Sequence, residues 1–299
     1  MDKQRTTQQH INKTSINKLC TIIFSSVLMT ACMSVSPESR EHLKANHVQQ
    51  TEITTLDHTT ILKTAYPRTQ TEAIAYVEPN DLDPYFKTLS AHQLTPDVLG
   101  FIHPTITYNN PQGELRYLII VEKVQINNGY ISSCRACQNT ADFLIYKHEA
   151  GQYQLVNSAL DQTQVPSANG HLQYQYASDL QKNLQPFGKN MMGSYVLSSY
   201  SGAGGDESSI WFAVHLPDEG KVQAVEIGAA GRDTSSFYAD RPALATSIYS
   251  TLKLIDNQST YYPIEVIYYH SDQSTSSPLQ RTQFIYDQQK QGYVEHSTR

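Results

Sequence analysis

The chain has 299 residues, a mean hydropathy of −0.45 and a net charge of −6 at pH 7 with histidine neutral. This length allows one large domain or two small ones once a leader and a linker are set aside. Twenty tyrosines stand against eight phenylalanines and one tryptophan, and tyrosine suits half-buried, pleated surfaces. The composition therefore favours β structure. The acidic balance, with no basic stripe interleaved with aromatic residues, argues against a nucleic-acid partner.

The first 31 residues have the organisation of an export signal. They carry four basic residues against Asp2, so the rest of the chain is more acidic than the total indicates. The basic segment ends at Lys18, and an apolar run broken only by small residues follows over residues 19–29. That run is shorter than the roughly 20 apolar residues that a helix needs to cross a bilayer. It is typical of the apolar region of a secretory signal peptide.

The end of this run, Leu28-Met-Thr-Ala-Cys32, resembles the lipobox of bacterial lipoproteins. Met29 stands where that family more often has leucine. The resemblance implies that residues 1–31 are a signal peptide that is removed, and that Cys32 is the lipidation site and carries acyl chains such as palmitate. Three acyl chains exceed the two membrane signals that stable anchoring requires.

The same resemblance implies a location at the outer membrane, because Met33 and Ser34 follow the cysteine and no aspartate stands there. We expect the protein to be lipid-anchored on the periplasmic face, and exposure at the cell surface is left open. Cys20 would be discarded with the leader. The resemblance covers residues 1–32 alone. Beyond them the sequence resembles exported bacterial proteins in general and indicates no particular family.

Residues 32–65 are rich in serine, glutamate, threonine, glutamine and histidine, without a sustained apolar period. Ile53, Ile61 and their apolar neighbours could form a short helix or strand, but the composition favours a polar linker behind the lipid anchor. We therefore predict a β-rich globular domain over residues 66–299.

One or two short helices are expected near residues 83–100. Asp83 stands at a capping position with Pro84 at the first helical position. A second helical turn is predicted from Thr95, continuing into Val98 and Leu99. Farther along the chain, residues 178–184 are a candidate for a third short helix.

The fold class predicted for the rest is mainly β, with α+β as the alternative, in antiparallel sheets built from hairpins. Apolar runs separated by turn-forming residues predict the hairpins. The run over residues 117–121 is unbroken, as in a central strand covered on both faces. Trp211 is expected in the core. The predicted strand pairs are 101–108 with 115–124, 142–146 with 152–156, 209–216 with 222–227, and 284–286 with 293–294.

Two of these hairpins resemble each other. In each, two tyrosines lie seven positions apart with a glycine between them, and an apolar strand lies upstream. The pairs are Tyr146 with Tyr153 and Tyr286 with Tyr293. This pattern is compatible with a duplicated strand–loop–hairpin unit, and equally with hairpins that recur through composition alone.

Cys134 and Cys137 form the only close cysteine pair, and their neighbours decide among four uses. Haem attachment requires histidine directly after the second cysteine, where Gln138 stands. A zinc site requires further ligands at fixed spacing, and no second such pair follows. A thioredoxin-like site requires a helix after the pair, whereas a strand pattern follows. We therefore predict a structural disulfide, as is usual in an oxidising compartment. Arg135, which would lower the pKa of a neighbouring thiol, keeps thiol-redox chemistry as an alternative.

The glycine-rich segment 201–207 does not match a nucleotide-binding motif. It lacks the third glycine of a dinucleotide fingerprint and the Gly-Lys-Ser/Thr of a P-loop. We interpret it as a turn between strands. Asp206 and Glu207 are a weak signal for a hard cation.

These observations do not define a catalytic set, because no Ser/His/Asp order, HExxH or carboxylate pair on a helical face is present. The leading hypothesis is an envelope lipoprotein that acts as a non-enzymatic binding or structural module. Its expected partners are the membrane, through the acyl chains, and an envelope protein or glycan. We expect no cofactor and no metal. The alternatives are a thiol–disulfide redox protein that uses Cys134 and Cys137, and an envelope hydrolase.

Overall fold

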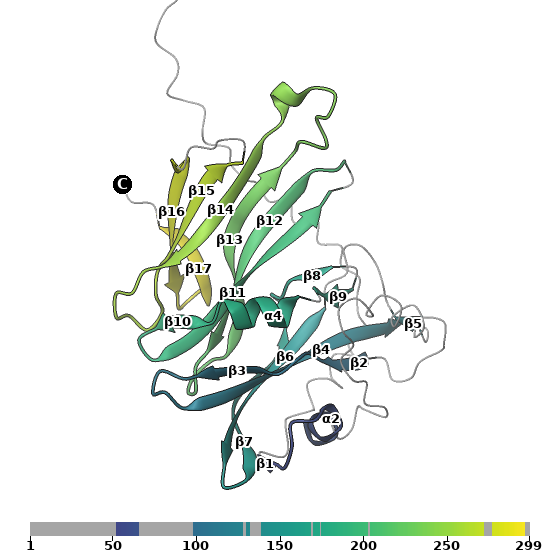
Figure 1. The fold of residues 1–299 in the computed structure, drawn as a ribbon, viewed down its shortest axis with the longest axis vertical. Coiled ribbons are helices and arrows are strands. Elements are labelled where there is room, and N and C mark those ends of the chain that lie inside the picture. Colours follow the sequence, from purple (N-terminus) through teal and green to yellow (C-terminus); the bar gives the residue numbers. More distant parts are fainter. Residues whose placement is uncertain are drawn as a thin grey trace, which may run out of the picture. The chain divides into compact units, whose positions relative to one another are not determined.

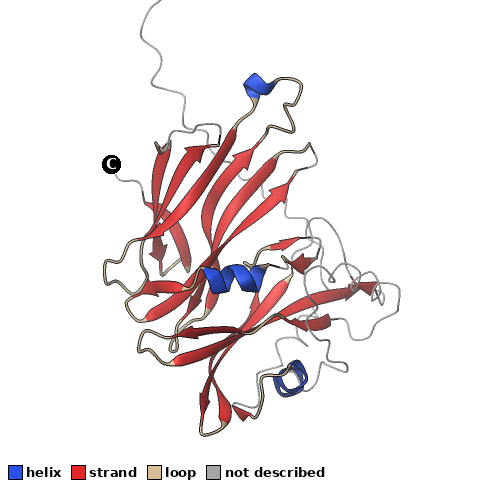
Figure 2. Cartoon of the chain, in the orientation of Figure 1, coloured by secondary structure: helices blue, strands red, loops and turns tan. Residues whose placement is uncertain are grey.

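Long runs of β-branched and aromatic residues make this chain mainly β. The part that the structure describes contains antiparallel sheets of seven and eight strands and one two-stranded sheet (Figures 1 and 2). The structure is a computed structural model. It describes residues 52–65, 98–127, 130–131, 139–168, 170–173, 175–202, 204–271 and 277–296. All of these belong to one compact unit, residues 42–299.

The first sheet has the strand order β1-β7-β6-β4-β2, with β3 and β5 also paired to β4. Burial follows the sequence closely in its centre, because residues 118–121 of β4 are at most 1% exposed. This confirms the central strand predicted from the unbroken apolar run. The strands are β1 (Glu52–Ile53), β2 (Val98–Ile102), β3 (Ile106–Asn109), β4 (Leu115–Asn127), β5 (Tyr130–Ile131), β6 (Thr140–Glu149) and β7 (Gln152–Gln162).

The second sheet runs in sequence order from β10 to β17. The predicted hairpins over residues 209–227 and 284–294 are present as β12–β13 and β16–β17. Its strands are β10 (Gln185–Gly188), β11 (Met191–Ser201), β12 (Glu207–Leu216), β13 (Gln223–Asp233), β14 (Ser247–Leu254), β15 (Ile264–His270), β16 (Gln280–Asp287) and β17 (Gly292–His296). A separate pair of short strands, β8 (Ser167–Ala168) and β9 (His171–Leu172), lies between the two sheets in the sequence.

The described part of the chain contains three short helices: α2 (His58–Ala65), α4 (Tyr176–Lys182) and the 3₁₀ turn η1 (Pro242–Leu244). Helix α4 agrees with the helix predicted over residues 178–184. Asp57 caps α2, since its carboxylate accepts the Thr60 N–H at 2.9 Å.

Two predictions about the N-terminal part need correction. The predicted linker ends too late: Ile53, Ile61 and Ala65 are at most 4% exposed and pack against β4 and β6, because these apolar positions share one face of β1 and α2. Residues 98 and 99 are not helical, since Val98–Ile102 pairs with residues 121–125 of β4 and the ladder outweighs the local helix signal. Residues 66–97, which contain the helix predicted at Asp83, lie outside the described part.

The two similar hairpins occupy equivalent places in their sheets. Each follows an antiparallel neighbour, β4 before β6–β7 and β15 before β16–β17. Their registers differ, however, because Tyr286 lies directly opposite Tyr293 whereas Tyr146 lies opposite Leu155. The shared strand order is that of any antiparallel meander, so it does not decide between duplication and recurrence by composition.

The second sheet supports apolar clusters on both of its faces. Strand β12 alternates between them: Phe212 and Val214 pack with the first sheet and α4, while Trp211 and Ala213 pack with β15, β16 and β17. The sheet can fold onto itself because β13 and β14 pair only at residues 232–233 of β13. Trp211 therefore lies in the core, as predicted from the sequence.

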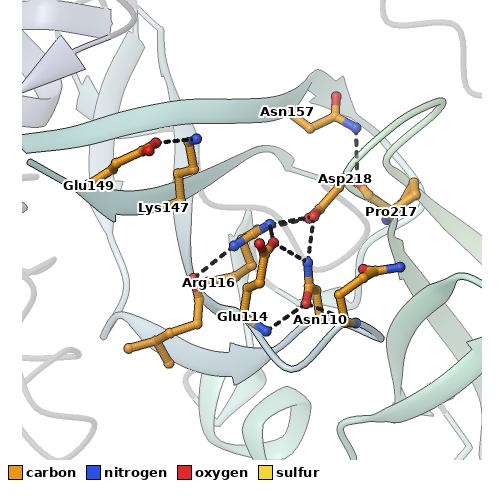
Figure 3. A network of polar contacts seen from close by, with 10 residues as sticks. Asn110, Glu114, Arg116, Lys147, Glu149, Asn157, Pro217 and Asp218 are labelled. Atoms are coloured by element: carbon orange, nitrogen blue, oxygen red, sulfur yellow. Dashed lines mark hydrogen bonds and ion pairs between the residues drawn. The ribbon is translucent and has the colours of Figure 1, made fainter.

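A buried arginine ties the two sheets together at one end (Figure 3). Arg116 on β4 donates to both carboxylate oxygens of Asp218, at 3.0 and 2.6 Å, and also to Glu114 at 2.5 Å. Asp218 lies in the turn between β12 and β13, and Asn110 donates to it at 2.8 Å. From β7, the Asn157 amide donates to the carbonyl oxygen of Pro217 in the same turn. Burial acts to raise the pKa of Asp218, but hydrogen bonds from Arg116 and Asn110 outweigh it and hold the pKa below its usual value.

Asp218→Asn tests this tie. We expect it to lower the free energy of unfolding at pH 7 by about 2 kcal/mol, because it leaves the buried guanidinium with only the exposed Glu114 as a charged partner. Loss of one partner from a fully buried pair costs about 3–5 kcal/mol, and the Asp218 side chain is 25% exposed. Urea unfolding measures the change. Glu114→Gln is the matched control: its side chain is 62% exposed, and a loss as large as that of Asp218→Asn would contradict the assignment.

Candidate functional site

A hollow of about 240 Å³ lies where β13 passes β17. The two strands belong to one sheet but do not pair, since β13 pairs with β12 and β14, and β17 pairs with β16. The chain runs from β13 through β14, β15 and β16 before β17 comes to lie beside β13. The residues that line the hollow are Gln164, Glu226, Ile227, Lys290, Gln291, Gly292, Tyr293 and Val294.

The floor of the hollow is buried and apolar, and its rim is polar. Ile227 and Tyr293 are 2% and 9% exposed and belong to the apolar cluster between β12, β13 and β15–β17. The turn between β16 and β17 forms one wall, and it is shaped by the Asp287 carboxylate, which accepts the N–H groups of Gln289 and Lys290 at 2.8 and 3.1 Å. The hollow therefore has a buried base and exposed groups that can form hydrogen bonds.

The rim carries one acid and one base. Glu226 comes from β13, and the partial burial of its carboxyl group raises the pKa of that group. Lys290 comes from the β16–β17 turn and is exposed. Gln164 is hydrogen-bonded to β13: its side-chain carbonyl accepts the Glu226 N–H at 2.8 Å. Such a site offers both signs of charge and amide groups to a ligand.

Behind Tyr293 lies a fully buried histidine. His215 Nε2 is 3.2 Å from the Tyr293 hydroxyl, and His215 Nδ1 is 3.2 Å from the Gln223 side-chain nitrogen. Gln223 also bonds the hydroxyl of Tyr286, whose ring stacks on Tyr261 with centroids 3.9 Å apart. Burial lowers the pKa of His215 to about 3, so the ring is neutral at physiological pH. This cluster fixes the aromatic floor of the hollow.

A second buried polar group lies in the first sheet. Glu122 accepts from the Asn139 amide at 2.9 Å and from the Leu172 N–H at 2.7 Å, and its other oxygen is 2.9 Å from His103 Nε2. On the opposite face of β4, Lys123 pairs with Asp142 at 2.8 Å and with Asp161 at 2.7 Å. These groups join five chain segments, and all of them except Asp161 are almost inaccessible, so we interpret them as structural.

Most of the site residues predicted from the sequence lie outside the described residues, and none of them lines the hollow. Cys32, Cys134 and Cys137 lie outside the described residues, so their lipidation and disulfide stay predictions. The glycine-rich segment contains the turn between β11 and β12, with the Gly202 N–H donating to the Asp206 carbonyl at 2.7 Å. Asp206 faces Arg232 at 3.9 Å. In the residues that the structure describes, no group of three or more His, Cys, Asp or Glu side chains could hold a metal ion.

Sequence reasoning did not find the hollow. The hairpin that contains Tyr286 and Tyr293 was predicted from the sequence. The proximity of β13 to β17 was not, because these two strands lie side by side without pairing. Within the described ranges, no helix is long and apolar enough to cross a membrane.

Comparison with known proteins gives no assignment: no family model, no curated protein and no solved structure matches this chain.

His215 should leave a signature in the pH dependence of stability. An unfolded histidine has a pKa of about 6.5, so between pH 6.5 and about 3 the unfolded state binds a proton that the folded state does not. The resulting stabilisation is present at neutral pH and is lost as the pH falls, with a slope approaching about 1.4 kcal/mol per pH unit. We expect His215→Gln to be less stable at pH 7 but to lose stability less steeply between pH 6 and 4. Urea unfolding from above pH 7 down to pH 4 measures the stability of both proteins. Above pH 7 the two curves of stability against pH should be parallel. Equal slopes below pH 6 would contradict the assignment.

Proposed function

We propose that this chain is a lipid-anchored binding module of the bacterial outer membrane, which holds an envelope partner and catalyses no reaction. The observation that carries the proposal is the hollow between β13 and β17, with its buried floor of Ile227 and Tyr293 and its exposed, polar rim. Concave sites with a few convergent polar groups are the usual places for ligands.

The titratable groups buried in the described residues favour binding over chemistry. His215 is held neutral by burial and is engaged with Tyr293 and Gln223. Glu122 accepts two hydrogen bonds and contacts His103 inside the protein. General acid–base catalysis requires such groups within reach of a substrate, whereas here they join strands.

The membrane part of the proposal rests on the lipobox-like segment that ends at Cys32. Acyl chains at that residue would keep the β-rich unit at the membrane and raise the encounter rate with envelope partners. A disulfide between Cys134 and Cys137 fits the same oxidising compartment.

Cys32→Ser tests the anchor. We expect this variant to lose its acyl chains, because the thiol is their attachment point, and to leave the membrane fraction. Mass spectrometry of the N-terminal peptide and fractionation of cells measure both effects. Cys20→Ser is the matched control, since Cys20 lies in the part of the leader that is removed, and it should behave as the wild type. A wild-type protein that retains residues 1–31 and stays in the cytosol would remove this part of the proposal.

Site-specific photocrosslinking in cells tests the binding role. With p-benzoylphenylalanine at position 291, on the rim of the hollow, we expect a discrete adduct to form on illumination. The same amino acid at position 112, in the exposed turn between β3 and β4, is the control and should give none. Gel shifts with an antibody against the chain measure both. If position 291 gives no adduct, or no more than position 112, the hollow does not face a partner.

A further inference from the structure

Lys123 on β4 lies between two aspartates of the first sheet. Its side-chain nitrogen Nζ is 2.8 Å from Asp142 Oδ1 on β6 and 2.7 Å from Asp161 Oδ1 on β7. The side chains of Lys123 and Asp142 are 5% and 0% exposed, whereas that of Asp161 is 35% exposed. A buried amine thus contacts one buried carboxylate and one that reaches solvent.

The pairing of β4 with β6 places the amine beside the buried carboxylate. Lys123 lies opposite Thr140, and Val121 lies opposite Asp142, so Lys123 and Asp142 are diagonal neighbours on one face of the sheet. The positions next to Asp142 on that face are apolar, because Val121 and Leu144 belong to a buried cluster that also contains residues of β1 and α2. Water therefore has little access to the contact between the two side chains.

A β-bulge directs Asp161 at the same contact. The register between β6 and β7 shifts on either side of Asp142, and Asp161 has a φ of 54°, in the left-handed region that is uncommon for residues other than glycine. In this conformation the Asp161 N–H donates to Asp142 Oδ1 at 2.6 Å while the Asp161 carboxylate contacts Lys123. Bulges commonly re-aim a side chain in this way next to active sites.

The end of β7 that carries Asp161 is held by the second sheet. The Gln162 side chain accepts the Ala224 N–H at 3.1 Å, and the Gln164 side chain accepts the Glu226 N–H at 2.8 Å. Strand β14 has left β13 at this point, so the two glutamine side chains take the place of a paired strand and cap β13 there. Both sheets therefore fix the position of Asp161.

From this arrangement we propose that Lys123 and Asp142 become joined by an amide bond that the chain forms on itself, with Asp161 as the catalytic base. An ion pair requires one carboxylate. Here the amine contacts two, and the Asp142 oxygen nearest to it already accepts a backbone N–H. The three residues supply the nucleophile, the base and the oxyanion donor that acyl transfer requires.

The reaction needs no reagent beyond these three side chains. Asp161 relays one proton from the Lys123 ammonium to the second carboxylate oxygen of Asp142, which gives a neutral amine and a carboxylic acid. The nitrogen attacks Asp142 Cγ, a C–N bond forms, and negative charge develops on Oδ1, where the Asp161 N–H stabilises it. Asp161 then relays a second proton from the nitrogen to the hydroxyl group, the C–O bond breaks, and water leaves. An ammonium and a carboxylate become an amide and water, so atoms and charge balance.

Burial favours the amide over the ion pair. Charges held away from water lose their hydration, and their mutual attraction often does no more than offset that loss. The bond removes the two buried charges and leaves the Asp161 carboxylate, the one of the three groups that solvent reaches. Exclusion of water from the contact also opposes hydrolysis of the product.

The bond closes a loop from residue 123 to residue 142, which contains Cys134 and Cys137. Unlike a disulfide between those cysteines, an amide bond persists under reducing conditions. It forms once and turns over no substrate, so it goes beyond the proposed binding role without altering it. Its effect is to fasten β4 to β6 covalently at the base of the loop.

Peptide mapping of the full chain, isolated from cells, tests the bond. The protein is unfolded, reduced and alkylated, so that a disulfide cannot join peptides, and is then digested with trypsin, which does not cleave after a lysine whose amine is acylated. We expect a branched peptide in which residues 117–135 are joined to residues 136–147. Its mass should be lower by one water molecule than the two peptides together, and fragment spectra should locate the link at Lys123 and Asp142.

Two variants test the roles of the aspartates. Asp161→Asn keeps the shape of the side chain and the backbone N–H but removes the base, so we expect the bond to form about a hundredfold more slowly or less. Asp142→Ala removes the acyl group and should give only linear peptides, cleaved after Lys123. Circular dichroism and thermal unfolding establish whether both variants are folded. Cleavage after Lys147 is the internal control, since that lysine also pairs with a carboxylate, that of Glu149, but at an exposed site.

Linear peptides from the wild type, with cleavage after Lys123, would overturn the proposal and leave an ion pair. A link located at Asp161, or one that forms as fast in Asp161→Asn as in the wild type, would overturn the assigned roles. The wild-type map requires no substitution, so a variant that fails to fold leaves this test intact. The binding role is judged separately, by the adduct from position 291.

Discussion

Burial of β12 on both faces is the constraint on which the rest of this structure depends. From Trp211 to Leu216 every residue is at most 9% exposed, so this strand can exist only with a layer packed on each side. The first sheet and α4 supply one layer, and β15, β16 and β17 supply the other. Because the second layer belongs to the same sheet as β12, the sheet has to bend sharply, and it does so where β14 leaves β13. Bulges in the β12–β13 ladder, together with Gly228, where a Cβ atom would lie 2.8 Å from the Phe284 ring, allow the close packing that follows.

The candidate site is a consequence of this bend. A flat eight-stranded sheet would keep β13 and β17 four strands apart, about 19 Å at the usual spacing. Folding brings them side by side without pairing them, and the unpaired space becomes a hollow with a hydrophobic floor. His215 stabilises that floor as a neutral ring held between tyrosine and glutamine side chains, so the base of the site is well defined. Burial of a neutral histidine requires such partners, because an unbonded ring nitrogen in an apolar cluster is costly.

How much of this could be predicted from the sequence depends on how local each signal is. The hairpin over residues 209–227 was predictable because the turn Pro217-Asp-Glu-Gly220 lies between two apolar runs. Val98 and Leu99 were misassigned because their strand is defined by β4, some 25 residues later in the chain. The apolar spacing of Ile53, Ile61 and Ala65 gave a weak signal that a polar composition outweighed. The hollow could not be predicted, since it depends on which strands remain unpaired after the sheet has bent, and no turn or period encodes that. The roles of Gln162 and Gln164 were equally hidden, because a glutamine in a polar stretch has the same sequence signature whether it faces solvent or caps a strand.

Those two glutamines also make the second sheet depend on the first. They lie at the last position of β7 and two residues beyond it, yet the amides they satisfy belong to β13, some 60 residues later. In the order of the chain, these two side chains come before the strand whose amides they satisfy, and one compact unit contains both. A fragment that began after residue 168 would lack this protection, and its bare strand would be free to associate with other copies of itself.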